Sequence, residues 1–173
     1  MSSEALNVIY TRRSVRSFTG EAISSDDLMK LLKAGMSAPT AVNIQPWSFV
    51  VVTDRGTLDK LCDLLPHAKM LDKAGAAIVV CGIPDKDAVY SKKYWVMDCS
   101  AATENILLAA HALRLGSVWT AVYSDMDRVK AVRGILNIPD NIIPLNVLPI
   151  GIPKGSGQPI DKFKEENIHW EKW

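Results

Sequence analysis

The sequence predicts one α+β domain with three α-β-α layers, in which a mixed sheet of about four to five strands lies around a central apolar helix. Helical and extended patterns alternate along the chain, which is typical of a sheet covered by helices. The pattern at 94–115 is the longest, and its 105–113 portion is apolar nearly all round, as in a helix that runs through a core. The 173 residues are 48% hydrophobic, which is enough for such a core without disulfides or a metal.

The first half of the chain predicts three helices and one strand. A helix begins at Ser3–Glu4 because apolar residues recur at positions 6, 9 and 10. A serine and aspartate capping signal at 24–27 begins a second helix, which should end near Pro39 because a proline disfavours helix in the residue before it. The β-branched run at 48–53 predicts a strand, and the apolar stripe at 57–65 predicts a third helix.

The rest of the chain predicts three more strands and two helices. The first of these two helices is the central helix at 94–115. The continuous apolar run at 77–81 is typical of a strand buried on both faces. Gly116 follows the central helix, and we expect it to provide the residue that ends this helix. A strand at 117–122, a helix at 125–136 and a strand at 145–151 complete the domain. Pro149 predicts an edge position or a bulge for the last strand.

Composition excludes several classes of protein. The 20 basic and 19 acidic residues give a net charge of +1, so we expect neither nucleic acid nor an anionic membrane as a partner. The three cysteines have no C-x-x-C spacing and the three histidines are scattered, which predicts no disulfide framework and no metal site. The N-terminal residues lack a signal-peptide pattern, and two prolines break the uncharged stretch 34–53. We therefore expect a cytoplasmic protein.

Motifs of several common enzymes are absent from the sequence. There is no P-loop, no G-x-G-x-x-G dinucleotide fingerprint and no G-x-S-x-G hydrolase turn. We assign no catalytic side chain on this basis. Three polar clusters remain as candidates for a binding site.

The first cluster, 11–18 (TRRSVRSF), follows the first helix and contains three arginines and two serines. Arg12, Arg13, Ser14 and Arg16 could bind a phosphate through charge-assisted hydrogen bonds. Arginines in a last helical turn can instead simply complement the helix dipole. That alternative accounts well for one arginine, but three arginines interleaved with serines favour a phosphate.

The second cluster, 37–47 (SAPTAVNIQPW), joins a helix to a strand, and its two prolines stiffen the connection. Asn43 and Gln45 offer both donors and acceptors, so the cluster could read the edge of a heteroaromatic ring. A long structural loop is the alternative. The third cluster is Lys162 and Lys164, which by themselves predict no more than a solvated charge pair.

Five motifs together identify a resemblance. The chain carries R-R-S-V-R-x-F from residue 12 and S-A-P-T-x-x-N-x-Q-P-W-x-F-V-V-V from residue 37. Farther on come L-G-S-V-W from residue 115, P-I-G-I-P from residue 149 and N-I-H-W-x-x-W at the end. In this order and spacing, the motifs resemble the nitroreductase family of flavin enzymes over nearly the whole chain.

This resemblance implies an FMN-binding homodimer with a nitroreductase-like fold and the flavin at the subunit interface. Residues 1–158 would form the FMN-binding domain, and 159–173 a C-terminal tail that extends onto the partner subunit. By motif position, Arg12, Arg13, Ser14 and Arg16 would hold the FMN phosphate, the ribityl chain or the pyrimidine edge. Asn43 and Gln45 would face the isoalloxazine, with Pro39 and Thr40 contributed by the partner subunit. Backbone groups around Trp119, Thr120 and Ala121 would approach the other side, and Lys162 and Lys164 would be the C-terminal phosphate cations.

The resemblance also implies an activity. NAD(P)H would give a hydride to the flavin and leave, and a nitroaromatic, a quinone or a similar flat acceptor would then take its place in a ping-pong reaction. Two alternatives stay open: a related FMN enzyme that dehalogenates or consumes flavin, and a non-enzymatic module that stores or senses flavin. The sequence decides neither the physiological acceptor nor the preference between NADH and NADPH.

Overall fold

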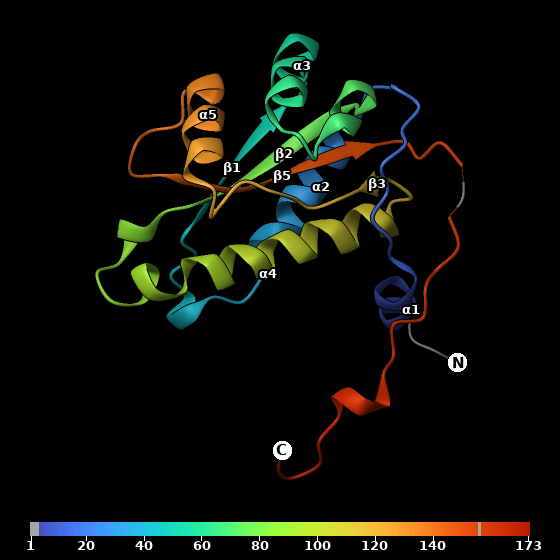
Figure 1. Ribbon diagram of the computed structural model, residues 1–173, viewed down its shortest axis with the longest axis vertical. Coiled ribbons are helices and arrows are strands. Elements are labelled where there is room, and N and C mark those ends of the chain that lie inside the picture. Colours follow the sequence, from blue (N-terminus) through green and yellow to red (C-terminus); the bar gives the residue numbers. More distant parts are fainter. Residues whose placement is uncertain (1–3, 156) are drawn as a thin grey trace.

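Five strands form one sheet in the computed structural model, which describes residues 4–155 and 157–173 (Figure 1). The order is β1 (Trp47–Val52), β2 (Ala76–Gly82), β5 (Ile143–Gly151) and β3 (Gly116–Ser117), and β4 (Thr120–Ala121) also pairs with β5. Ser3, where the first helix is predicted to begin, lies outside the described residues. The α+β class and the sheet of four to five strands are confirmed.

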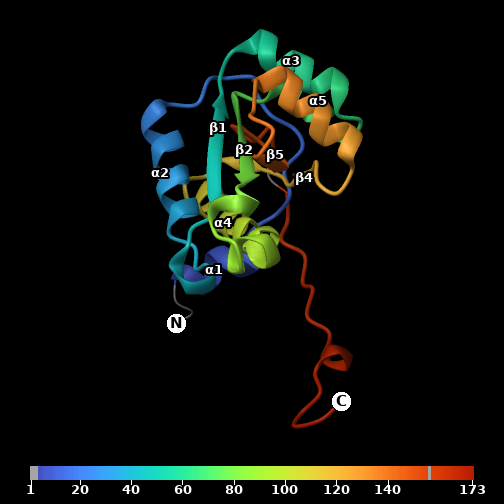
Figure 2. The ribbon, with the colours of Figure 1, turned by 90° about the vertical axis from the view of Figure 1, so that its left-hand side faces the viewer.

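Helices cover both faces of this sheet (Figure 2). One side carries α2 (Ser25–Met36) and the long α4 (Tyr90–Ala112), and the other carries α3 (Arg55–Leu64) and α5 (Met126–Leu136). The short α1 (Glu4–Thr11) lies beside α4 and buries none of its residues. No helix in the described part of the chain is long and apolar enough to cross a membrane.

The side chains of β2 alternate between two hydrophobic clusters. Ala77, Val79 and Cys81 pack with α3 and α5, whereas their neighbours Ile78 and Val80 pack with α2 and α4. All seven residues of the strand are buried. The continuous apolar run at 77–81 is therefore a strand buried on both faces, as the sequence predicts.

The expected mixture of strand directions is not observed within the chain. Every pair of strands in the described residues is antiparallel. Alternation of strands and helices suggests crossovers that end in parallel strands, but the connection from β1 to β2 contains both α3 and a 3-10 helix at Lys69–Lys73 that packs on it. Because α3 and the 3-10 helix pack on each other, the connection returns to the end of the sheet where β1 finishes. β2 begins there and runs antiparallel to β1.

The predicted strand at 117–122 is two short strands, because Val118 and Trp119 leave the ladder between them. This break explains a second difference from the sequence analysis. Pro149 lies in the central strand β5 opposite Ala77, and the irregularity in that ladder falls at Val80 and Cys81. On its other side β5 has no paired residue opposite Pro149, so a residue that lacks an N–H is tolerated there.

The central helix also ends earlier than predicted. It stops at Ala112, and Arg114, not Gly116, has the left-handed conformation, with φ of 60°. Gly116 is needed for another reason: a Cβ at this position would lie 2.8 Å from Val15 and 2.9 Å from Phe18. The absence of a side chain thus lets the segment after α1 approach β3.

The segment 13–19 is held against the sheet by backbone hydrogen bonds. Val15 N–H donates to Ser117 O at 2.9 Å, and Thr19 N–H donates to Ile152 O at 3.0 Å. Between them Phe18 is buried, with only 3% of its surface exposed, and packs directly over Gly151. This packing sets the position of the arginines and serines that precede Phe18 in the chain.

We expect Gly151→Ala to lower the free energy of unfolding by about 1–3 kcal/mol, because the new Cβ would lie 2.5 Å from the ring of Phe18. Urea denaturation measures the effect. The matched control is Gly134→Ala in α5, where no atom lies within 4 Å of the new Cβ and helix propensity should add about 0.5–1 kcal/mol. Equal stabilities for the two variants would contradict the role given to the Phe18–Gly151 contact.

Candidate functional site

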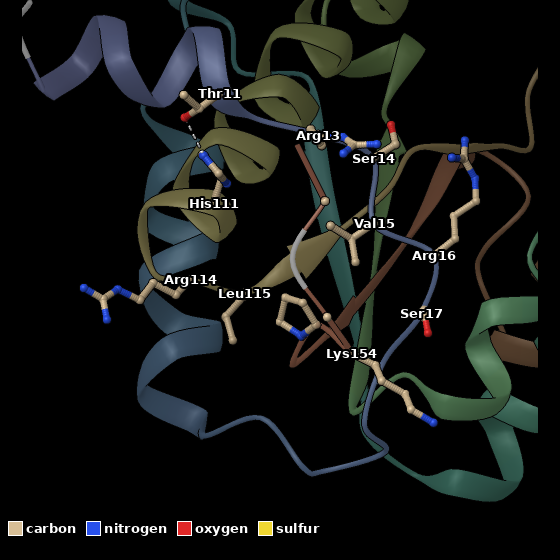
Figure 3. Close-up of a pocket in the computed structure, with 13 residues that line it drawn as sticks. Thr11, Arg13, Ser14, Val15, Arg16, Ser17, His111, Arg114, Leu115 and Lys154 are labelled. Atoms are coloured by element: carbon tan, nitrogen blue, oxygen red, sulfur yellow. Dashed lines mark hydrogen bonds between the residues drawn. The ribbon is translucent and has the colours of Figure 1, made fainter. Parts of the chain in front are cut away.

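A cavity of about 570 Å³ opens where segment 13–17 passes the C-terminal end of α4 (Figure 3). It is lined by residues of the first cluster, of the end of α4 and of the chain after β5: Thr11, Arg13, Ser14, Val15, Arg16, Ser17, His111, Arg114, Leu115, Pro153, Lys154, Gly155 and Gly157. Three of the predicted phosphate ligands thus share one cavity.

The cavity is strongly positive. Its lining has four cationic side chains (Arg13, Arg16, Arg114 and Lys154) and no acidic residue. In the described part of the chain, none of these four side chains makes an ion pair or a hydrogen bond. Figure 3 shows Ser14 between the side chains of Arg13 and Arg16, whereas Arg114 and Lys154 point away from them. Two free guanidinium groups beside a hydroxyl can bind a phosphate.

His111 and Thr11 close one end of the cavity. The Thr11 hydroxyl donates to Asn7 O at 2.6 Å, so its only proton is used. The 2.8 Å contact between Thr11 Oγ1 and His111 Nε2 is then a bond donated by the histidine. Burial lowers the pKa of His111, and the nearby positive charge of Arg12 lowers it further.

Arg12 lies outside this cavity. Its Nε donates to Glu104 Oε1 at 3.0 Å, and with Lys162 it borders a second cavity of about 770 Å³ between α1 and the tail. Lys164 lines neither cavity and lies 4.0 Å from Glu166. The structure therefore brings together Arg13, Ser14 and Arg16 but leaves Arg12 and the two tail lysines apart from them.

The second cluster forms a rigid loop beside the N-terminal half of α4. A short 3-10 helix, Ala41–Asn43, follows Thr40, whose hydroxyl accepts the N–H of Gln45 at 3.0 Å. The exposed side chains of Gln45 and Asn43 bond to each other at 3.1 Å. Asp98 of α4 accepts the N–H of Ala41 and so ties this loop to the helix.

Within one chain the two clusters are far apart. The loop at 39–45 contacts α4 at Asp98, whereas the cationic cavity contacts it at His111. These two positions are thirteen residues apart in the helix, which is roughly 20 Å along its axis. Pro39, Thr40, Asn43 and Gln45 therefore cannot line the cationic cavity of their own chain.

The residues around the third predicted contact lie on the sheet. Trp119 is half-buried, the Thr120 hydroxyl donates to Val147 O at 2.5 Å, and Ala121 is exposed at the start of the turn into α5. None of the three lines the cationic cavity. Arg114, Lys154 and His111 do line it but are not predicted by the sequence analysis, because each is an isolated polar residue whose position only the fold reveals.

The fold and the cavity together define a class: a three-layer α+β protein with a cationic cavity at the end of its central helix. Comparison of sequences gives the family. The profile of the nitroreductase family matches residues 9–68 and 63–152. The chain therefore belongs to the nitroreductase family, as the resemblance of its motifs implies.

Several relatives cover the chain from end to end. A protein of Archaeoglobus fulgidus named as a candidate NADH dehydrogenase/NAD(P)H nitroreductase is 49% identical over 98% of this chain and 99% of its own. A crystal structure with the same description from Bacteroides thetaiotaomicron is 43% identical and superposes with a TM-score of 0.95 over 100% of both chains. A protein of Desulfovibrio desulfuricans described as a candidate nitroreductase, solved in complex with FMN, is 27% identical with a TM-score of 0.85 over 100% of this chain and 99% of its own.

Titration of His111 tests the electrostatics of the cavity. Because burial and the Arg12 charge both disfavour the imidazolium, NMR should give His111 a pKa below its ordinary 6.5, and Arg12→Gln should raise that pKa part of the way back. The contribution of neutral His111 to stability is then present above pH 6.5 and lost as the pH falls. Arg114→Gln is the control, since Arg114 points away. A pKa at or above 6.5, or one that Arg12→Gln does not raise, would contradict this account.

Proposed function

We propose that this protein is an FMN-dependent oxidoreductase that uses NAD(P)H to reduce nitroaromatics, quinones or similar flat acceptors. The observation that carries the proposal is the cavity beside segment 13–17, where Arg13 and Arg16 have no anionic partner in the described chain and flank the Ser14 hydroxyl. A phosphate monoester carries close to two negative charges at neutral pH and would satisfy both guanidinium groups. Membership of the nitroreductase family supports the assignment of this phosphate to a flavin mononucleotide.

The second cluster fits the ring of the same cofactor. The amides of Asn43 and Gln45 are exposed and bond only to each other within the described chain, so they are available to a ligand. The pyrimidine edge of a flavin alternates carbonyl oxygens with ring nitrogens, which are the groups that amides pair with. Trp119, Thr120 and Ala121 would contact the ring from the other side, and Arg12 the ribityl chain.

The separation of the two clusters favours a site shared by two copies of the chain. Since roughly 20 Å of α4 lies between them, we propose a homodimer in which the Pro39–Gln45 loop of one copy meets the cationic cavity of the other. The tail 159–173 would lie across the second copy, bringing Lys162 and Lys164 to the phosphate. Its aromatic side chains need such a surface: Phe163, Trp170 and Trp173 are 71%, 84% and 100% exposed.

Bound FMN supplies a ring that takes a hydride from the nicotinamide donor and passes it to the acceptor once the donor has left. The chain itself would bind and orient: Arg13 and Arg16 would neutralise the phosphate, Ser14 would donate a hydrogen bond to it, and the loop would fix the ring. We assign no proton transfer to a side chain.

Two other functions are compatible with a flavin site: a related enzyme that dehalogenates or consumes flavin, and a module that stores flavin. Steady-state oxidation of NADH and NADPH should be fast with a nitroaromatic or quinone. Negligible turnover with every acceptor would leave the storage function, and turnover only with a halogenated aromatic or free flavin would favour the related enzymes.

The phosphate assignment predicts a difference between two ligands. Arg13→Ala should weaken FMN binding by about one to two decades, because a hydrogen bond to a charged group contributes about 1.5–3 kcal/mol. Riboflavin lacks the phosphate and should bind the native protein and the variant almost equally. Fluorescence titrations with both flavins measure this. Equal losses for the two ligands would show that Arg13 does not contact the phosphate.

The tail predicts an effect on assembly. Deletion of 159–173 should weaken the dimer by at least about tenfold in its dissociation constant, because the tail's apolar contacts with the second copy are lost. Analytical ultracentrifugation measures the constant, and replacement of Trp170 and Trp173 by serine in the full-length chain separates the indole contacts from chain length. A truncated chain that stays a stable, FMN-loaded dimer would refute the proposed position of the tail.

A further inference from the structure

Asp98 is a buried acid that none of the roles above uses. It lies on α4 with 7% of its surface exposed, and its Oδ1 accepts the N–H of Ala41 at 3.2 Å. Its other oxygen, Oδ2, is buried and has no hydrogen-bond partner in the described part of the chain. Burial raises the pKa of this carboxyl group, although the bond from Ala41 opposes the shift. A buried carboxyl group with one oxygen unsatisfied costs stability, so it calls for a compensating role.

The segment that Asp98 holds has an unfavourable backbone. Val42, Asn43 and Gln45 have φ values of 43°, 58° and 56°, in the left-handed region that side chains with a Cβ disfavour. Such a conformation persists only where the surroundings impose it.

Two further contacts hold the end of this segment. The N–H of Gln45 donates to Thr40 Oγ1, and Lys86 Nζ donates to Gln45 O at 2.8 Å. At the start of the 3-10 helix, the Asp98–Ala41 bond is the tie to α4. The backbone is therefore fixed at both ends while the Asn43 and Gln45 side chains project into solvent.

We propose that Asp98 is a positioning residue for the cofactor: by holding Ala41, it imposes the backbone that aims the amides of Asn43 and Gln45 at the flavin ring. The inference rests on the proposed function, because it assigns a role to a residue that does not itself touch the ligand. It also explains why this position of α4 has an acceptor. A carboxylate oxygen can hold a backbone N–H in place, whereas an apolar side chain would fill the same space without fixing the loop.

A double-mutant cycle on FMN affinity tests the proposal. Asp98→Ala and Asn43→Ala should each weaken FMN binding by about tenfold, and the double variant by little more than either, because Asp98 acts through the Asn43 amide. Additive losses, about a hundredfold together, would overturn the proposal, since a purely structural role does not depend on Asn43. Ser91→Ala is the matched control: Ser91 is a fully buried polar residue of α4 with an unpartnered hydroxyl, and its effect should simply add to that of Asn43→Ala.

The conservative variant gives a second readout. Asp98→Asn keeps an oxygen for Ala41 N–H, so its FMN affinity should stay within about threefold of the native value, and the absorption spectrum of the bound flavin should not change. Asp98→Ala should change that spectrum in the way Asn43→Ala does. An Asp98→Asn variant as impaired as Asp98→Ala would overturn the proposal, because the negative charge rather than the bond to the loop would then matter.

Hydrogen exchange separates this inference from the proposed function. In the protein without added flavin, Asp98→Ala should speed exchange of the Ala41 amide by about tenfold or more, and Asp98→Asn should not. Unchanged exchange in Asp98→Ala would overturn the role of Asp98. If the native protein holds no FMN and takes up none, the proposed function fails, and the exchange result still decides whether Asp98 holds the loop.

Discussion

Burial of the central strands on both faces is the constraint on which the rest of this structure depends. β2 and β5 are apolar along nearly their whole length, so helices must cover the sheet on each side. On one side this cover is α2 together with α4, and α4 is 23 residues long. The length of that single helix then separates the two polar clusters, one beside Asp98 and the other beside His111.

The cationic cavity shows how a binding site can be assembled from backbone contacts. Phe18 is buried over Gly151, and Val15 N–H bonds to the backbone of β3, so the residues between and beside them must face outward. Two of these residues are arginines without partners in the described chain. Like charges held close together repel each other, so this arrangement is unfavourable until an anion binds. The stable sheet edge thus holds two unpaired guanidinium groups in the cavity that we propose as the phosphate site.

The loop beside Asp98 of α4 uses a different principle. Its backbone is unfavourable by itself and is held by the Asp98 carboxyl group, the Thr40 hydroxyl and the Lys86 ammonium group. In our proposal this backbone aims the two amides of the loop. Because folding already orders this loop, the loop loses less conformational entropy when a ligand binds. In the proposed site, the cationic cavity would bind through its charge and the loop through its rigid backbone. Both parts contact α4.

The sequence by itself determined the three-layer class, the buried run at 77–81 and the long helix of the second half, because each depends on local pattern or on residue chemistry. The binding of a phosphate by residues 12–16 stays a prediction. The family also follows from motifs that are continuous in the chain. The tertiary structure decided three other features, because they depend on what lies beside each segment. These are the strand directions, the break between Ser117 and Thr120, and the tolerance of Pro149 in a central strand. The same is true of the site, because its partners are far apart in the chain and only folding brings them together. Lys154 lines the same cavity as Arg13. Arg12 donates to Glu104, and Asp98 accepts the N–H of Ala41.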